Sequence, residues 1–407
     1  MPATPLEMSD AAAPPERILN PEFVKLFAAF HFFMLGMSVF NLLPHYLELR
    51  GASEGMYGAV AGTLGVVNFF CIVVWGHQAD RWSRKTTVVF YLLLGLAGNA
   101  VAILAMDAPL NWYFLSRAFQ GITMGLGLPI IFVWTFEVSP PARKQEALAW
   151  IGIAGLTANS LGPLLAELIL SVQGSPPVHA EWYFPVFLTA TGLMLVAQLL
   201  FLSVRNTRAA GGETAGETSL WPLVRRRHAG LILLVAVIFG GVFGIMVSFA
   251  KNFMVFLGLN FASVLFGAYS LGAILSRIFI RTLIHRLTPA RMVPFGLAGI
   301  AIGILLIGFS TNYAMLAGSG LVYGLSHGIL YPILFVRFVE SQPPEHLGRA
   351  AILFMGSFSG GWGLFPSLGG VVLQWTSFPT LFFIMSGFAV LALFIYRRTL
   401  QDAPAAG

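Results

Sequence analysis

Long apolar runs constrain this chain more than any other feature, because they fill nearly all of its 407 residues. A hydrocarbon core about 30 Å thick is crossed by a helix of about 20 mostly apolar residues. Lipid-exposed backbone must be hydrogen-bonded internally, which leaves helices or closed barrels, and runs this long favour helices. We therefore predict an all-α membrane protein with twelve transmembrane helices. The predicted spans are residues 23–47, 54–75, 87–106, 110–136, 147–171, 183–203, 229–250, 261–280, 292–311, 314–336, 350–373 and 377–396.

The composition excludes several classes of protein. The chain is 57% hydrophobic and 10% charged, whereas soluble domains are about 45–50% apolar and about 25% charged. So few charges cannot cover a water-soluble body of this size, which excludes a cytosolic enzyme, a disordered chain and a nucleic-acid-binding domain. The single cysteine, Cys71, excludes a disulfide framework and a cysteine-based metal site. Since no nucleotide loop, catalytic carboxylate pair or metal cluster stands out, we expect neither enzymatic activity nor a cofactor.

The basic residues predict the orientation in the membrane. If the N-terminus is cytoplasmic, 19 of the 23 Lys and Arg lie in cytoplasmic segments. The opposite side holds Arg50 and Lys251, and Arg117 and Arg277 lie inside spans. Because cytoplasmic loops of membrane proteins are enriched in Lys and Arg, we predict an inner-membrane protein with both termini in the cytoplasm. The net charge of +6 is then a topology signal and needs no nucleic-acid partner.

The chain divides into two similar halves. A hydrophilic segment, 204–228, separates a predicted six-helix bundle at 23–203 from a second at 229–396, with tails at 1–22 and 397–407. The first tail is acidic and Pro/Ala-rich, so we expect it to be disordered and not a signal peptide. Residues 116–147 laid over 319–350 match at eleven positions without a gap. We infer a duplicated six-helix unit with pseudo-twofold symmetry.

A loop motif between the second and third spans, together with the two halves, resembles the major facilitator superfamily. Gly76, Asp80, Arg81 and Arg84 follow the family pattern G-x-x-x-D-R-x-G-R-R/K, with Ser83 where glycine is usual. The resemblance implies two six-helix bundles that rock around a central site, as secondary transporters do. It also implies that this loop forms a cytoplasmic gate, in which the carboxylate pairs with arginine and with a helix N-terminus.

Two further motifs resemble those of proton-coupled members of this superfamily. Arg117-Ala-Phe-Gln120-Gly in the fourth span is similar to the R-x-x-Q-G motif, which implies a role in proton and substrate coupling. Gly162-Pro163 in the fifth span resembles the G-x-x-x-G-P motif of exporters, with Ala158 in place of the first glycine. Because proline lacks a backbone donor and glycine allows close helix packing, we expect a hinge there.

Arg117 and Glu167 are charges placed within predicted spans. At 1.5 Å per residue, Arg117 lies about 10 Å and Glu167 about 6 Å from the outer surface. A buried cation is costly unless it meets a partner or water. One alternative is that the Arg117 side chain extends to the outer interface, where its charge stays in water. We expect a structural ion pair between the two, a proton-binding Glu167 tuned by Arg117, or a Glu167 that is solvated at the membrane interface.

Of the remaining candidates, His31, Asn41, Tyr323 and His327 lie in the first and tenth spans, which the resemblance implies to line the cavity. His31 and His327 are predicted near mid-depth, where each serves either as a packing residue or as a proton site, since histidine titrates near neutral pH. Asn41 and Asn159 are candidates for polar contacts with substrate. Tyr323 and Trp362 are candidates for stacking on it.

These features favour a secondary transporter, and three hypotheses remain open. The first is a proton-coupled exporter of small amphipathic organic molecules, acting as a monomer within the lipid bilayer. The second is a proton-coupled uptake symporter for a sugar or an organic anion, in which Arg117 binds the anion. The third is a non-transporting membrane receptor or assembly subunit. Retention of Asp80, Arg117 and Glu167 argues against the third, because a scaffold has no need of intramembrane charge.

Overall fold

The computed structural model describes residues 18–75, 83–207, 221–225, 228–284, 288–343 and 346–401. Throughout these ranges the regular structure is helical, and none of it is strand. The helices of the first half are α1 (Pro21–Val39), α2 (Leu43–Leu49), α3 (Glu54–Trp75), α4 (Arg84–Leu104), α5 (Trp112–Ile122), α6 (Leu128–Val138), α7 (Lys144–Ser171) and α8 (Tyr183–Ser203). Those of the second half are α9 (Trp221–Val224), α10 (Ala229–Phe256), α11 (Ser263–Ile284), α12 (Pro289–Phe309), α13 (Tyr313–Glu340), α14 (Leu347–Leu373) and α15 (Phe378–Gln401).

Short polar residues begin several of these helices. The Asn20 side chain accepts a hydrogen bond from the Phe23 amide at 2.9 Å, which caps α1. Ser83 caps α4 and Asn312 caps α13 in the same way. Such caps satisfy backbone donors that have no partner within the helix. The local sequence therefore sets where the spans begin, even in a chain that is otherwise almost continuously apolar.

The all-helical membrane fold predicted from the sequence is confirmed. Ten helices of the described residues are long and apolar enough to cross a membrane. The other two predicted spans correspond to α11 and α14, which have 22 and 27 residues and pack among those ten. Of α11, the part Ser263–Ile278 counts as a shorter apolar helix, and α14 is not among the ten, so the crossing of the membrane by these two helices stays a prediction.

The predicted segment boundaries differ from the helices in a few places. Helix α15 continues to Gln401, so residues 397–401 are helical although we predicted a tail from 397. The linker predicted at 204–228 contains α9. Residues 1–17, 208–220, 226–227 and 402–407, which make up most of the predicted tails and linker, lie outside the described residues.

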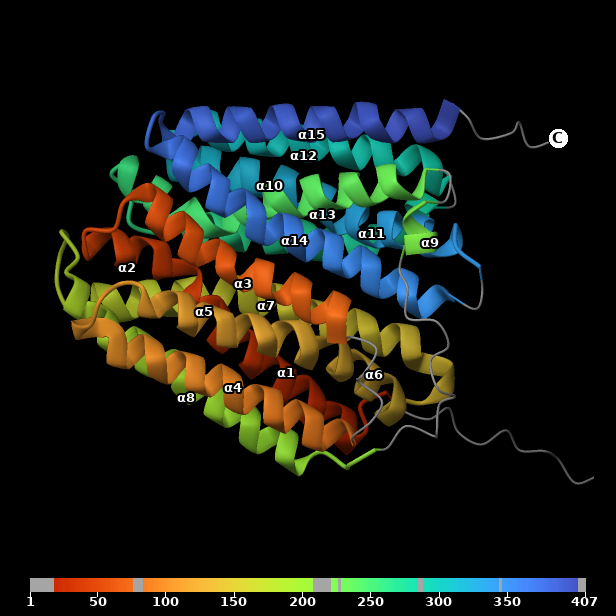
Figure 1. The fold of residues 1–407 in the computed structure, drawn as a ribbon, viewed down its shortest axis with the longest axis horizontal. Helices are drawn as coiled ribbons and strands as arrows, with labels where there is room; N and C mark the ends of the chain where they lie inside the picture. Colours follow the sequence, from red (N-terminus) through yellow and green to blue (C-terminus); the bar gives the residue numbers. More distant parts are fainter. Residues whose placement is uncertain are drawn as a thin grey trace, which may run out of the picture.

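The two halves lie one above the other in Figure 1, with α3 and α14 along their border. Glycine permits this contact, because a β-carbon at Gly58 would lie 2.5 Å from the carbonyl oxygen of Pro366. It would also lie 2.8 Å from the Cα of Gly370. Helices α7 and α11 form a second contact between the halves.

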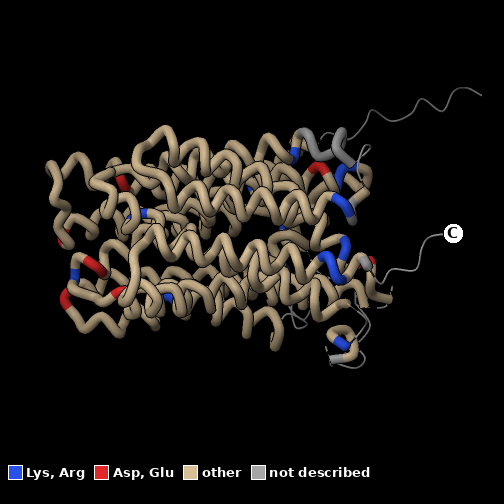
Figure 2. The backbone as a smooth tube through the Cα atoms, turned by 90° about the horizontal axis from the view of Figure 1, so that it is seen from above, with Lys and Arg blue, Asp and Glu red and all other residues tan. Residues whose placement is uncertain are grey.

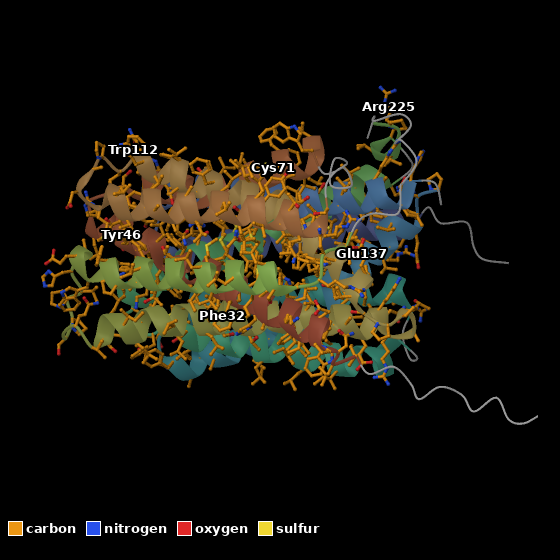
Figure 3. All side chains as sticks on the ribbon, turned by 90° about the horizontal axis from the view of Figure 1, so that it is seen from below. Phe32, Tyr46, Cys71, Trp112, Glu137 and Arg225 are labelled. Carbon is orange, nitrogen blue, oxygen red and sulfur yellow. The ribbon has the colours of Figure 1, made fainter. Side chains whose placement is uncertain are left out.

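The two ends of the bundle differ in charge, as Figure 2 shows. We call the end where α4 and α7 begin and α13 and α15 end the basic end, because Lys and Arg gather there. The other, which we call the far end, carries several acidic residues. In Figure 3, Tyr46 and Trp112 lie toward the far end, and Glu137 and Arg225 lie toward the basic end. This distribution matches the asymmetry that we used to predict the orientation.

Candidate functional site

A cavity of about 220 Å³ lies between the two halves. The first half contributes residues of α3, α6 and the turn before α6, and the second half contributes α10, α11, α13 and α14. The cavity lies near the middle of the bundle, because its lining residue His327 is 14 residues from the start of α13 and 13 from its end. The residues that line the cavity are Asn68, Ile72, Met124, Leu128, Pro129, Phe243, Arg277, His327, Tyr331, Met355, Phe358, Ser359 and Trp362.

Aromatic rings enclose His327 on several sides. Its imidazole ring lies 4.9 Å from the Phe243 ring, nearly edge to face, and 6.2 Å from the nearly parallel ring of Tyr331. Phe239 packs at 4.8 Å and Phe358 at 6.3 Å. The Nδ1 atom of His327 is buried and has no hydrogen-bond partner among the described residues. The imidazole is therefore held in place by packing, and this nitrogen is left without a partner.

Two other polar groups face the same cavity. Asn68 is 3% exposed, and its Oδ1 atom is buried without a partner in the described part of the chain. Arg277 is half-buried, and a β-carbon placed on Gly152 of α7 would lie 3.1 Å from its Cζ. No described residue forms an ion pair with Arg277. The guanidinium thus reaches from the second half to the backbone of the first without a carboxylate beside it.

The structure separates the predicted cavity residues into two groups. Trp362 and His327 line the cavity, as we expected. Asn41 and Asn159 do not; they contact each other, with Asn41 Nδ2 donating to Asn159 Oδ1 at 3.4 Å. Tyr323 is fully buried, with its ring 6.2 Å from that of His327, and is not among the lining residues. In this conformation Tyr323 packs behind the histidine and has no access to a bound molecule.

Arg117 and Glu167 do not meet, so the predicted ion pair between them is wrong. Arg117 is 7% exposed, and its Nη1 atom donates to Gln120 Oε1 at 2.7 Å. Gln120 donates in turn to Asn99 at 2.9 Å. The Arg117 Nε atom has no partner among the described residues. The depths of the two charges are similar, but α7 packs against α1 and α11, which takes Glu167 away from α5.

Glu167 instead joins the two halves near the far end. Its Oε1 atom accepts from Lys251 Nζ at 3.0 Å and from the amide of Ala262 at 2.7 Å, and its Oε2 atom accepts from the amide of Ser263 at 3.0 Å. The side chains of Glu167 and Lys251 are 1% and 5% exposed. Lys251 also donates to the Asn260 carbonyl. The N-terminus of α11 also stabilises the negative charge of Glu167, because the helix dipole is positive at that end. We call this set of contacts the latch.

Among the described residues, three further hydrogen bonds cross between the halves. Asn252 donates to Glu48 at 2.8 Å. The Ser160 hydroxyl donates to the carbonyl of Phe266 at 3.1 Å, and the Ser270 hydroxyl donates to that of Leu156 at 2.8 Å. Phe243 of the cavity and Lys251 of the latch are eight residues apart on α10, which places the latch about 12 Å nearer the far end. The halves are thus closed together on that side of the cavity.

The predicted gate is only partly described. Gly76, Asp80 and Arg81 lie outside the described residues. Arg84 lies within them, and its Nε atom pairs with Glu137 Oε1 at 3.1 Å. Thr207 donates to the other oxygen of Glu137. Because Arg84 is on α4 and Glu137 on α6, this ion pair ties helices of one half and does not join the two halves.

The predicted hinge lies inside a helix that the structure shows as continuous. Pro163 is within α7, which runs without a break from Lys144 to Ser171. Gly162 allows the close approach that we expected, because a β-carbon there would lie 2.9 Å from the backbone carbonyl carbon of Ser38. His31 also contacts this helix, with its Nδ1 atom 3.0 Å from the carbonyl oxygen of Ala154. A hinge role for Gly162 and Pro163 stays a prediction.

Sequence reasoning missed two features of the site. Lys251 was counted only as a charge outside the membrane, because we ended the seventh span at residue 250, whereas α10 continues to Phe256. The fourth span contains a π-helical turn, Thr123–Gly127, which includes the cavity residue Met124. Such turns occur often at functional sites. The Gly-x-Gly sequence Gly125–Gly127 was the available signal for it.

The chain belongs to the Major Facilitator Superfamily, because the model of that family matches residues 26–289 and 257–406. It is 22% identical over 369 residues to the Staphylopine export protein of Staphylococcus aureus, a match that covers 86% of this chain and 88% of that one. It is 28% identical over 170 residues to the Inner membrane transport protein YajR of Escherichia coli, covering 40% of this chain. It is 30% identical over 123 residues to Multidrug resistance protein 3 of Bacillus subtilis, covering 30%.

The last two matches are partial, since they span 35% of YajR and 23% of Multidrug resistance protein 3. Solved structures agree with the fold over nearly the full chain. The nucleoside transporter NupG superposes with a TM-score of 0.77 at 16% identity, covering 94% of this chain and 100% of that one. A bacterial homologue of the human lysosomal transporter Spinster gives 0.72 at 13% identity, covering 94% and 98%.

Proposed function

We propose that this protein is a secondary active transporter that exports small amphipathic organic molecules in exchange for protons, by alternating access. The observation that carries the proposal is a cavity at mid-length between the two halves, closed toward the far end by the latch. A molecule held in the cavity would leave at the far end once the latch opens and the halves rock. The direction is supported by relatives whose names describe export, among them the Staphylopine export protein and the Bacillibactin exporter of Bacillus subtilis.

The proton carrier in this proposal is His327 and not Glu167. A carrier must exchange its proton with water on each side of the membrane in turn. Glu167 is buried in the latch at the far end, where its negative charge holds the halves together. His327 faces the cavity, and histidine is the residue type whose ordinary pKa lies nearest physiological pH. When Nε2 carries the proton of the neutral ring, the free Nδ1 has one lone pair. Substrate and proton compete for it, which gives exchange.

Arg117 and Gln120 keep a proposed role in coupling. They stand in α5 directly before the π-helical turn that carries Met124 into the cavity wall. A buried cation without a carboxylate partner is sensitive to any change in its hydrogen bonds. Gly162 and Pro163 are the proposed hinge in α7, on which Glu167 stands. His31 also lies against α7 and is a second candidate for a proton site.

The proposed orientation places the basic end in the cytoplasm, together with both termini, the linker and the Gly76–Arg84 gate. A reporter fused within residues 172–182 should then be external, and one within 206–220 cytoplasmic. A cytoplasmic signal at 172–182 would contradict this topology. We further propose that a single chain is the functional unit, because the cavity is complete within one copy.

Transport itself is tested with the purified protein in liposomes that contain a pH-sensitive dye. Aryl carboxylates and aryl amines are added outside under an imposed pH gradient. Exchange predicts that proton flow and substrate flow run in opposite directions and that the proton flow stops in His327→Gln. Flow of both in the same direction would favour the uptake symporter, a hypothesis supported by the cationic Arg277 in the cavity. No flow of either with any probe would favour the non-transporting receptor.

A further inference from the structure

Arg277 makes the cavity positively charged. The lining residues that the structure describes include this guanidinium and no Asp or Glu, and none of the described carboxylates pairs with it. A guanidinium in a largely apolar cavity recognises a carboxylate or similar anion through two parallel hydrogen bonds. It disfavours an organic cation in the same place, because like charges repel strongly where water is scarce.

Two buried polar atoms, which belong to residues that line the same cavity, also need partners. Nδ1 of His327 and Oδ1 of Asn68 are both without a hydrogen bond among the described residues, and Asn68 is 3% exposed. Buried polar atoms are almost always satisfied, and leaving one without a partner is destabilising. Both atoms accept hydrogen bonds when the imidazole is neutral with its proton on Nε2. A ligand that donates one or two hydrogen bonds would satisfy them.

The remaining walls set the shape and size of the ligand. Phe243, Tyr331, Phe358 and Trp362 present aromatic rings, and neighbouring rings are 5.1–6.1 Å apart. Aromatic walls favour a flat apolar group in offset or edge-to-face contact. The volume of about 220 Å³ equals that of about seven water molecules, which suits one ring with a short polar chain.

We infer that the substrates are small single-ring organic anions that also carry a hydrogen-bond donor, and that Arg277 selects their negative charge. This inference rests on the proposed function, because it takes the cavity as the substrate site, and it deepens that proposal by naming the chemical class. Hydroxylated aryl carboxylates are the simplest molecules of this class. The anion would contact Arg277, the donor would contact His327 or Asn68, and the ring would lie among the aromatic side chains.

The test is equilibrium binding to the detergent-purified full chain, followed by ligand-dependent thermal stability. Three probes share one ring: 3-phenyllactate, its uncharged primary amide, and the cation 2-phenylethylamine. We expect 3-phenyllactate to bind about tenfold or more tightly than either other probe, as expected for a charge-assisted hydrogen bond. In Arg277→Gln this preference should fall to less than about twofold, and Arg277→Lys should keep part of it.

Arg143→Gln is the matched control, because it also removes one cation but lies at the basic end and pairs with Glu146. It should keep the full preference for 3-phenyllactate. Tighter binding of 2-phenylethylamine, or an unchanged preference in Arg277→Gln, would overturn the inference. Binding needs no gradient, so the two proposals fail separately. Selective binding without transport in liposomes would contradict only the proposed function, and transport without selection by Arg277 would contradict only the inference.

Discussion

The latch offers the most direct test of how the halves move. Glu167→Gln keeps the size of the side chain but removes its charge, which leaves the Lys251 ammonium buried beside an amide. Two backbone amides, of Ala262 and Ser263, also lose a charged acceptor. All of these donors belong to the second half, whereas Glu167 belongs to the first. The substitution should therefore destabilise only the state in which the halves meet at the far end.

The size of the effect follows from the burial of the pair. Both side chains are at most 5% exposed, and breaking a buried ion pair by removing one partner costs about 3–5 kcal/mol. A loss of about 3 kcal/mol changes an equilibrium more than a hundredfold. A 99:1 preference for closure at the far end would then fall below 1:1. The same substitution should change the folding of each half little, because the latch lies between them.

The populations are measured by the distance between spin labels at the far end. Val172 follows α7 and Trp375 follows α14, and both are 84% exposed. Cysteines at these two positions, in a Cys71→Ala background, report the separation of the halves. In the parent protein we expect one short distance, and in Glu167→Gln a second, longer distance that holds at least half of the population.

A double substitution provides the control. Glu167→Gln with Lys251→Met removes both charges and leaves no unpaired ammonium, so its shift should be smaller than that of Glu167→Gln alone. Arg84→Gln breaks an ion pair within one half and should leave the distance at the far end unchanged. An unaltered distance distribution in Glu167→Gln would refute the latch as the element that holds this end closed.

Three further predictions follow from the same contacts. Gly58→Val should open the far end in the same spin-label measurement, since its side chain would collide with the backbone of Pro366; no change would mean that the α3–α14 contact accommodates the side chain without separation of the halves. Arg117→Ala and Glu167→Ala should have additive effects on thermal stability, within about 0.5 kcal/mol, whereas coupling would indicate that the two charges meet in another state. His327→Phe should weaken 3-phenyllactate binding, because it keeps an aromatic ring but removes the Nδ1 acceptor; unchanged binding would mean that the hydroxyl donor of the ligand does not reach His327.

The path of the chain was largely predictable from the sequence. Hydropathy reports burial in lipid, and that single physical requirement predicted the all-helical membrane fold. Local chemistry predicted one close contact as well, since Gly162 is approached by α1 at the backbone of Ser38. The charge asymmetry between the ends followed from the Lys and Arg positions alone.

The partner of Glu167 was not predictable by the same reasoning. Counting residues from the surface gives depth along the membrane normal, but it says nothing about which side of a helix a residue occupies or which helices are neighbours. Arg117 and Glu167 share a depth and still do not meet, because α7 packs against α11 of the other half. The role of Lys251 was missed because the predicted seventh span ends at residue 250. Lys251 was therefore assigned to a loop, whereas α10 continues to Phe256.

Only some of the cavity-lining residues were predictable, namely those for which depth along the helix was enough to place the side chain in the cavity. Trp362 and His327 line it, but Asn41 and Asn159 contact each other and Tyr323 is covered. Polarity alone cannot distinguish a side chain that faces a cavity from one that pairs with its neighbour. The π-helical turn at Thr123–Gly127 changes which residues of the fourth span face inward, and no regular periodicity would place Met124 correctly.

The α7–α11 contact connects the proposed substrate site to the latch. Helix α11 carries Ser263, whose amide binds Glu167, and Arg277, whose guanidinium lies against Gly152 of α7. The two residues are 14 positions apart, or about 21 Å along one helix. Rocking of the halves changes the separation of α7 and α11 at both places together. An anion that draws Arg277 away from Gly152 therefore has different contacts in the two states, which is the condition for a ligand to shift an equilibrium. By reciprocity, an open latch must change the affinity for that anion by the same factor.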